Sequence, residues 1–112
     1  MLCVIGTIFF TLFIWTVWGN TALMTNAVAI SSSRIPAAFS GFRIAQVSDL
    51  HNAEFGKNNA ELLKLLSESR PDIIVITGDL IDANHTDVGI ALGFAQESVR
   101  IAPTYYVTGN HE

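Results

Sequence analysis

Short apolar segments alternate with longer segments of helical periodicity from Phe42 to the end of the chain. The segments 42–47, 73–76 and 104–107 are rich in β-branched and aromatic residues, a composition that is typical of strands. Segment 73–76 is apolar at every position, which indicates a strand buried on both faces of a parallel sheet. The pattern therefore predicts three strands.

Two helices are predicted between these strands. Segment 58–70 places leucines on one broad face and ends before Pro71, and Asn58 or Asn59 can cap its first turn. Segment 86–100 predicts a weaker helix, because its glycines each lower helix propensity by about 1 kcal/mol. The strand–helix–strand–helix–strand order predicts an α/β fold with parallel strands.

The N-terminal part has a different pattern, since no charged residue or histidine precedes Arg34. Residues 2–18 form one apolar run, and spanning a bilayer takes about 17–20 such residues. Trp15 and Trp18 at its end suit the membrane–water interface. We therefore predict a single-pass transmembrane anchor over 1–19.

A cleaved signal peptide is the alternative for this run, because residues 27–29 (AVA) offer a small-x-small cleavage site. The absence of a basic start favours the uncleaved anchor. Residues 20–41 are predicted to hold a strand over 23–30 followed by a linker. Membrane localisation is expected, and the basic-poor N-terminus slightly favours an extracytoplasmic position for residues 42–112, the predicted domain.

Composition narrows the possible functions. The formal net charge is −4 with only six Lys and Arg, so binding to nucleic acid through phosphate neutralisation is not expected. Cys3 is the only cysteine, which excludes an intrachain disulfide and a cysteine-rich zinc site.

Polar side chains with ligand atoms follow each predicted strand. The spacing between the three groups is about 30 residues, the length of a strand–helix–strand unit. Parallel strands built in this way end at one edge of the sheet, where open α/β sheets bind ligands. We therefore expect these side chains to converge: Asp49, His51, Asp79, Asp82, Asn110 and His111.

Glycine precedes two of these groups, at Gly78 and Gly109. Glycine permits a sharp turn and a close approach of backbone and ligand. Mixed Asp, Asn and His ligands suit Mn, Fe or Zn better than Ca or Mg. Two such metals about 3.5–4 Å apart are a recurrent device of phosphoryl chemistry.

Three sequence blocks resemble those of the calcineurin-like metallophosphoesterases. Asp49 and His51 match the DxH block, Asp79 and Asp82 match GDxxD, and residues 109–112 match GNHE. The resemblance covers 42–112 and implies an αββα sandwich, of which this chain holds the first βαβαβ half. The apolar N-terminus is similar to the bacterial membrane-associated branch of the family.

The resemblance also implies roles for the site residues. Asp49 and His51 would bind a first divalent metal, Asp79 would bridge two metals and Asn110 would bind the second. His111 would be the catalytic acid or phosphate-stabilising group. The role of Glu112 stays open. Asp82 is expected to orient a histidine.

The family pattern continues with a further His and a GHxH block, which this chain lacks. We therefore expect it to be the N-terminal part of such an enzyme, inactive by itself. His85 is expected to be an exposed loop residue, and the glycosylation tripeptide at 84–86 matters only in a eukaryotic secretory context.

Two functions follow. The first is a membrane-anchored hydrolase that uses two divalent metals on a phosphomonoester, phosphodiester or pyrophosphate, with a lipid headgroup or cell-envelope phosphate as a plausible substrate. The second is an inactive membrane-tethered α/β module that binds a metal or a partner.

Overall fold

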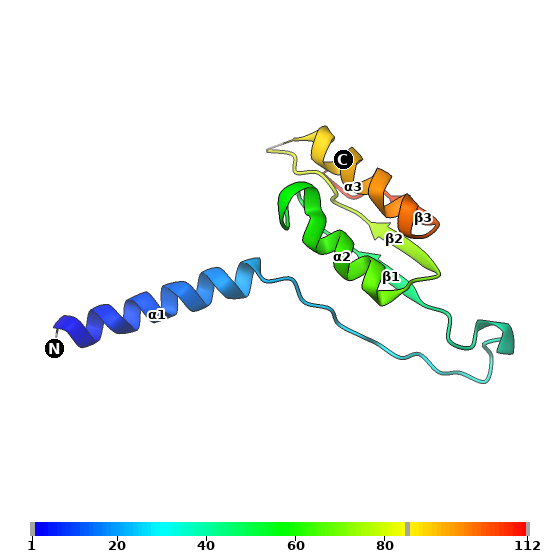
Figure 1. The fold of residues 1–112 in the computed structure, drawn as a ribbon, viewed down its shortest axis with the longest axis horizontal. Coiled ribbons are helices and arrows are strands. Elements are labelled where there is room, and N and C mark those ends of the chain that lie inside the picture. Colours follow the sequence, from blue (N-terminus) through cyan, green and yellow to red (C-terminus); the bar gives the residue numbers. More distant parts are fainter. Residues whose placement is uncertain (1, 85, 112) are drawn as a thin grey trace.

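The computed structural model describes residues 2–84 and 86–111, so His85 and Glu112 lie outside the described residues. A long N-terminal helix leads through an irregular segment to an α/β layer (Figure 1). The elements in chain order are α1 (Leu2–Thr21), η1 (Ala37–Phe39), β1 (Ile44–Val47), η2 (Lys57–Asn59), α2 (Ala60–Ser69), β2 (Ile73–Thr77), α3 (Val88–Ile101) and β3 (Thr104–Val107).

The three strands form one parallel sheet in the order β1-β2-β3. Ile44 pairs with Ile73 in the first ladder, and Ile74 pairs with Thr104 in the second. The predicted α/β fold and the parallel arrangement are confirmed. All three strands therefore end at the same edge of the sheet.

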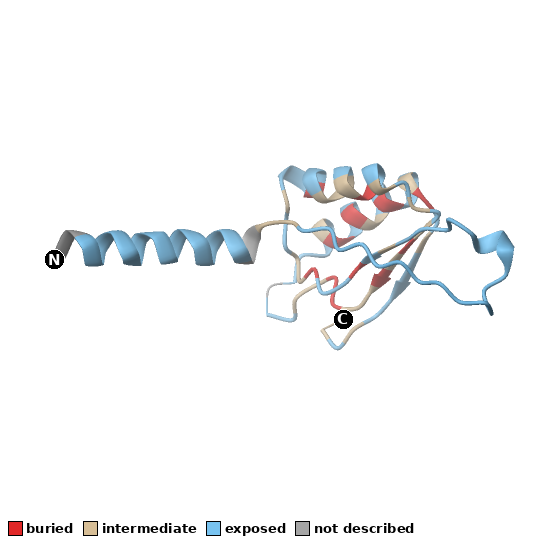
Figure 2. Cartoon of the chain, turned by 90° about the horizontal axis from the view of Figure 1, so that it is seen from below, coloured by how far each residue is buried: buried red, intermediate tan, exposed pale blue. Residues whose placement is uncertain are grey.

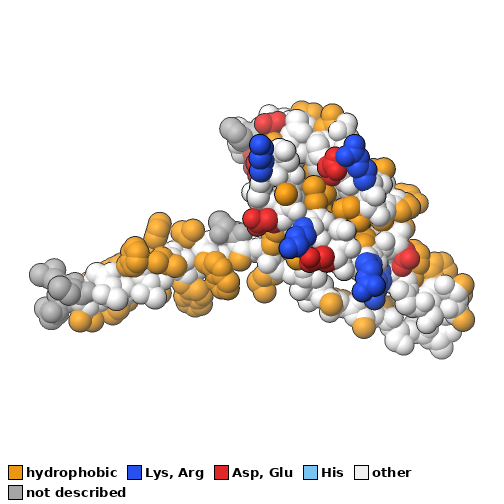
Figure 3. Space-filling model, viewed as in Figure 1, with side chains coloured by type: hydrophobic (Ala, Val, Ile, Leu, Met, Phe, Trp, Pro, Cys, Tyr) orange, Lys and Arg blue, Asp and Glu red, His pale blue; other side chains and the backbone are white. Residues whose placement is uncertain are grey.

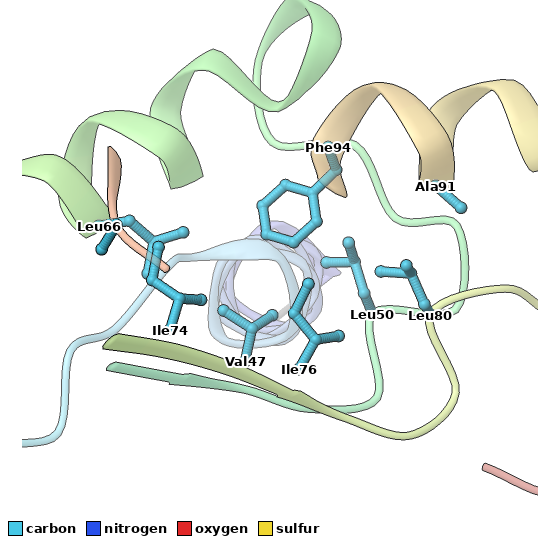
Figure 4. Close-up of a cluster of buried hydrophobic side chains, with 9 residues drawn as sticks. Val47, Leu50, Leu66, Ile74, Ile76, Leu80, Ala91 and Phe94 are labelled. Carbon is cyan, nitrogen blue, oxygen red and sulfur yellow. The ribbon is translucent and has the colours of Figure 1, made fainter. Parts of the chain in front are cut away.

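The core lies between the sheet and the two helices α2 and α3, which cover one face (Figure 2). The ring of Phe94 points from α3 toward Ile74 and Ile76 of β2 (Figure 4). These three side chains are almost completely buried. Their burial fixes the register of β2 against the helices, because a shift by one residue would turn both isoleucines to the other face.

The prediction that β2 is buried on both faces is wrong for the described residues. Ile74 and Ile76 are buried, whereas Ile73, Val75 and Thr77 are only half-buried. This alternation arises because α2 and α3 lie on the same face of the sheet (Figure 2). A continuous apolar run shows that both faces of a strand can be buried. It does not show that residues 42–112 supply a helix for each face of the sheet.

The helix ends differ from those predicted. Asn59 makes no cap hydrogen bond to α2; its Oδ1 instead accepts from the Phe55 N–H at 2.9 Å. Helix α3 begins at Val88 and is capped by Asp87, whose Oδ1 accepts from Gly89 N at 2.9 Å and Ile90 N at 3.2 Å. The helix therefore begins two residues after the predicted start at residue 86.

The N-terminal part also requires corrections. Among the residues that the structure describes, no helix is both long and apolar enough to cross a membrane, so the predicted anchor over 1–19 is not supported. The predicted strand over 23–30 is wrong, since 22–32 contain neither helix nor strand. A strand needs a neighbour to take its backbone hydrogen bonds, and the described sheet consists of β1, β2 and β3.

Helix α1 projects from the α/β layer (Figure 1). The radius of gyration is 18.1 Å, whereas a compact chain of this length has about 13 Å. The difference reflects the 63 Å long axis along which α1 extends.

Candidate metal centre

Backbone pairing between β1 and β2 continues past the strand ends into the ligand-bearing loops. Asp49 N donates to Gly78 O at 3.3 Å, and His51 N donates to Asp79 O at 2.9 Å. Asn52 N donates to Leu80 O at 3.1 Å. The two loops therefore run side by side, which brings their side chains together although they lie about 30 residues apart in sequence.

The loop after β3 is held against Asp79. Gly78 N donates to Val107 O at 2.9 Å, and His111 N donates to the Asp79 Oδ1 at 3.0 Å. A Cβ atom on Gly109 would overlap the Asp79 carboxylate and lie 2.5 Å from its backbone nitrogen. The close approach predicted for this glycine is therefore present.

Left-handed backbone conformations gather at this edge of the sheet. Asp49, His51, Asn52 and Asp79 have φ angles of 54°, 47°, 56° and 42°. Such angles cost a residue with a Cβ about 1–2 kcal/mol, although Asn, Asp and His adopt them most readily among such residues. Strained backbone of this kind clusters at functional sites, where it aims side chains that a regular strand would turn away.

Two buried leucines anchor the ligand loops. Leu50 lies between Asp49 and His51, and Leu80 follows Asp79; both side chains point toward the helices (Figure 4). Each is only 6% exposed. The core thus holds the loops in place and leaves the neighbouring polar side chains at the sheet edge.

Asp49, His51 and Asp79 form a first group of ligand atoms, all within 4.8 Å of one another. His51 Nε2 lies 3.8 Å from Asp79 Oδ2. That separation is too long for a hydrogen bond, but it suits two atoms that each bind one ion at about 2.0–2.2 Å. Asp79 is buried, Asp49 is exposed and the His51 side chain is 35% exposed.

His51, Asp82 and His111 form a second group within the same distance. His51 Nδ1 lies 3.9 Å from Asp82 Oδ2, and the His51 and His111 rings meet edge to face with centroids 5.0 Å apart. Nδ1 of His111 accepts from the Ala83 N–H at 3.4 Å. The structure therefore brings Asp82 and His111 to the same edge as the first group.

Asn110 is exposed and lies between two residues that contact Asp79, namely Gly109 and His111. Its position at the end of β3 is therefore set by its neighbours. All six predicted site residues thus lie at one edge of the sheet. Their chemical roles stay predictions.

Asn52 was missed in the sequence, although it links the loops after β1 and β2. Its Oδ1 accepts from Asp82 N at 2.9 Å and from Asp87 N at 3.2 Å, and its Nδ2 donates to Asp87 O at 2.6 Å. An Asn directly after a predicted ligand, at a position where the chain must turn, is a signal that could have identified it.

The side chains at this edge fit a divalent metal. Carboxylates repel one another until a cation joins them. Nδ1 of His51 is buried and has no hydrogen-bond partner among the described residues, which is unusual for a buried nitrogen. A donor set of carboxylates and imidazoles suits first-row metals such as Mn, Fe and Zn.

Parallel α/β sheets bind ligands at their carboxyl edge, and the carboxylates and histidines gathered there form groups that could hold a metal ion. Residues 42–112 match the family described as calcineurin-like phosphoesterase. The chain belongs to that family.

Curated relatives carry the same designation. The chain is 42% identical over 60 residues to an uncharacterized metallophosphoesterase of Bacillus subtilis, covering 52% of this chain and 21% of the relative. It is 35% identical over 98 residues to one of Campylobacter jejuni, covering 83% and 25%. A transmembrane protein with a metallophosphoesterase domain from Danio rerio is 30% identical over 88 residues, covering 76% and 20%.

The chain therefore spans between a fifth and a quarter of the length of these relatives. No solved structure matches it significantly.

Proposed function

We propose that the protein is a metal-dependent hydrolase of phosphate esters. The observation that carries this proposal is the meeting of Asp49, His51 and Asp79, from two strand ends, within 4.8 Å. Family membership supports the same reaction class. Two divalent ions, when bound, polarise the phosphate ester and activate water for attack on phosphorus.

The chain's own residues have distinct parts in this proposal. Asp49 and His51 would hold a first ion, Asn110 would hold a second, and the Asp79 carboxylate would serve both. The Asp79 carboxylate is already oriented by the His111 N–H at 3.0 Å. His111 protonates or stabilises the leaving oxygen.

Asp82 has a positioning part. Its Oδ2 lies 3.9 Å from Nδ1 of His51, and a carboxylate beside a ligating histidine fixes the ring and raises its basicity. Asp82 is therefore proposed to orient a histidine rather than to touch the substrate.

Membrane association is part of the proposal. Exposed apolar side chains lie along residues 4–19 of α1, a stretch that contains no charged residue (Figure 3). Its Thr11 and Thr16 hydroxyls donate to backbone carbonyls four residues earlier, at 2.8 Å each, which satisfies them within the helix. The relatives from Danio rerio and Bos taurus are named transmembrane proteins.

A substrate at a membrane surface follows from that association. We propose a phosphomonoester, phosphodiester or pyrophosphate, with a lipid headgroup or a cell-envelope phosphate as the favoured class. Mn, Fe or Zn are the proposed metals, because the site mixes carboxylate and imidazole ligands.

The test is an assay of hydrolysis by the full-length protein with added Mn²⁺. The substrates are 4-nitrophenyl phosphate, a monoester, and bis(4-nitrophenyl) phosphate, a diester. We expect Asp79→Asn to lower turnover by more than about 100-fold. Loss of a residue that only hydrogen-bonds to a metal ligand already lowers metal affinity or activity by about 10–100-fold. Glu68→Gln on the exposed face of α2 is the control and should keep full turnover. Undiminished turnover in Asp79→Asn would refute the assignment.

A module that binds metal without turnover is the second candidate. The first group offers three ligand residues to a metal, whereas a site for two metals needs several more donors. Metal binding by the protein with no hydrolysis of either ester would support this candidate over the hydrolase.

A further inference from the structure

The two ring nitrogens of His51 face different groups of side chains. Nε2 lies 3.8 Å from Asp79 Oδ2, whereas Nδ1 lies 3.9 Å from Asp82 Oδ2. The first group includes Asp49 and the second includes His111. The imidazole therefore stands between two sets of ligand atoms, of which only the first is assigned to a metal ion in the proposed catalytic centre.

We propose that His51, Asp82 and His111 form a separate cation position, selective for a borderline divalent ion such as Zn²⁺. It gives Asp82 and His111 a ligand role that goes beyond the positioning and acid roles of the proposed hydrolase. The set contains two histidines and one carboxylate, which is a common protein donor set for first-row metals. A metal ion binds an unprotonated nitrogen, so binding at Nδ1 of His51 releases any proton there to solvent.

The distances permit this assignment. The three ligand atoms already lie within 4.8 Å of one another. Two donors that each lie about 2.0–2.2 Å from a tetrahedral ion are about 3.3–3.6 Å apart. Small rotations of the three side chains would shorten the distances between their ligand atoms to this range. The Asp82 carboxylate and both histidine rings are only half-buried, so they have room to rotate.

An unsatisfied atom at the centre of the group supports the proposal independently. Nδ1 of His51 is buried and lacks a hydrogen-bond partner among the described residues. A buried polar atom without a partner is costly, and a bound ion at this point removes that cost. A cation on the Asp82 side can do so, because Nδ1 faces Asp82 whereas Nε2 faces the first group.

The backbone of the group is held before any ion arrives. Asn52 Oδ1 accepts from Asp82 N at 2.9 Å, and Asp79 Oδ1 accepts from His111 N at 3.0 Å. His51 N donates to Asp79 O at 2.9 Å. An ion therefore meets a largely ordered site, which lowers the entropy cost of binding.

Occupancy of this position has a consequence for the proposed reaction. An ion on His111 removes the group assigned to the leaving oxygen. Excess zinc should therefore inhibit hydrolysis that manganese supports, and Asp82→Asn should relieve that inhibition.

The first experiment is titration of the full chain in mild detergent with Zn²⁺, followed by calorimetry. We expect Asp82→Asn and His111→Gln each to weaken zinc binding at this position by at least about 10-fold. Asp49→Asn should weaken zinc binding by the first group and keep the affinity of this position within about 3-fold. Glu68→Gln is the control for removal of a carboxylate elsewhere. If Asp49→Asn abolishes zinc binding and Asp82→Asn does not, the proposal is wrong.

A second experiment reports direct contact with the ion. Asp82→Cys, in a Cys3→Ser background, should give a thiolate-to-cobalt charge-transfer band in the near ultraviolet when Co²⁺ is added. Folding is checked by circular dichroism. A folded variant without the band would overturn the proposal.

The matched variant Asp72→Cys, on an exposed carboxylate next to β2, should give no band. The band at position 82 should also survive Asp49→Asn, which removes hydrolysis. Absence of hydrolysis would therefore count against the proposed hydrolase, whereas absence of the band at position 82 would count against the zinc position.

Discussion

Single residues at the carboxyl edge of the sheet adopt backbone conformations that their side chains alone would not predict. The sequence identified Asp49, His51 and Asp79 by their chemistry and spacing. Their positive φ angles depend on the pairing of one loop with another, which is a long-range property. The residue types were thus predictable, whereas the local geometry that aims them was not.

The sequence did reveal that the chain needs a residue without a side chain at Gly109. We expect Gly109→Ala to destabilise the fold by about 1–3 kcal/mol, because an added methyl group is forced into a filled space. That space is occupied by the carboxylate and backbone nitrogen of Asp79. The measurement is the urea midpoint of unfolding.

Gly93 provides the matched control for this substitution. It is exposed in α3, and an added Cβ meets nothing within 4 Å. Gly93→Ala should stabilise the chain by about 0.5–1 kcal/mol through helix propensity. Equal midpoints for the two variants would show that Asp79 does not lie against Gly109.

At the scale of elements, the loops behave as extensions of the strands. The periodicity of apolar residues predicted the helices and strands of the α/β layer, because burial against a common core depends on local pattern. The caps were less predictable: Asn59 and Asp87 are both suitable cap residues, but the side chain of Asn59 accepts from the Phe55 N–H four residues earlier instead of capping α2.

Asn52 joins two of these extended loops. We expect Asn52→Gly to lower stability by about 1–3 kcal/mol, because its loss leaves the partially buried N–H of Asp82 and the backbone groups of Asp87 without this partner. Glycine is used because it accepts the positive φ without strain. Urea unfolding measures the change.

Asn58→Gly is the appropriate comparison for Asn52→Gly. Asn58 also has a positive φ, of 55°, but it is exposed. Its replacement should change stability by less than about 0.5 kcal/mol. If both substitutions have the same small effect, the side-chain contacts of Asn52 do not stabilise the loops.

At the scale of the whole molecule, the α/β layer and α1 follow different rules. The α/β layer is stabilised by its buried core, and its Lys and Arg side chains lie on the surface (Figure 3). Helix α1 instead exposes aromatic side chains such as Phe9, Phe13 and Trp15, each about two-thirds exposed or more. The sequence predicted an apolar helix here, but helix length and hydropathy alone did not establish a membrane span.

Exposed apolar surface of this kind marks sites of membrane or protein interaction. We expect the full chain to float with phosphatidylcholine–phosphatidylglycerol vesicles on a density gradient. Replacement of Phe9 and Phe13 together by Lys should reduce the floating fraction severalfold, since a lysine is costly in the apolar part of a bilayer.

Val99→Lys is the control for that pair, because Val99 is 61% exposed on α3 and lies in the charged part of the molecule. It should leave flotation unchanged. A full chain that remains at the bottom of the gradient with the vesicles present would rule out the proposed association.

The parallel order of the sheet also has a kinetic consequence. The contacts that assemble the site join distant positions: Ser48 and Thr77 are 29 residues apart, and Asp79 and His111 are 32 apart. Such pairs cannot form until the intervening helix has crossed the sheet, and closing each loop costs entropy in advance. During synthesis, a chain that has not yet reached Val107 therefore leaves one edge of β2 unpaired and open to wrong partners. The rate at which β3 docks should decide how much of the newly made protein escapes aggregation.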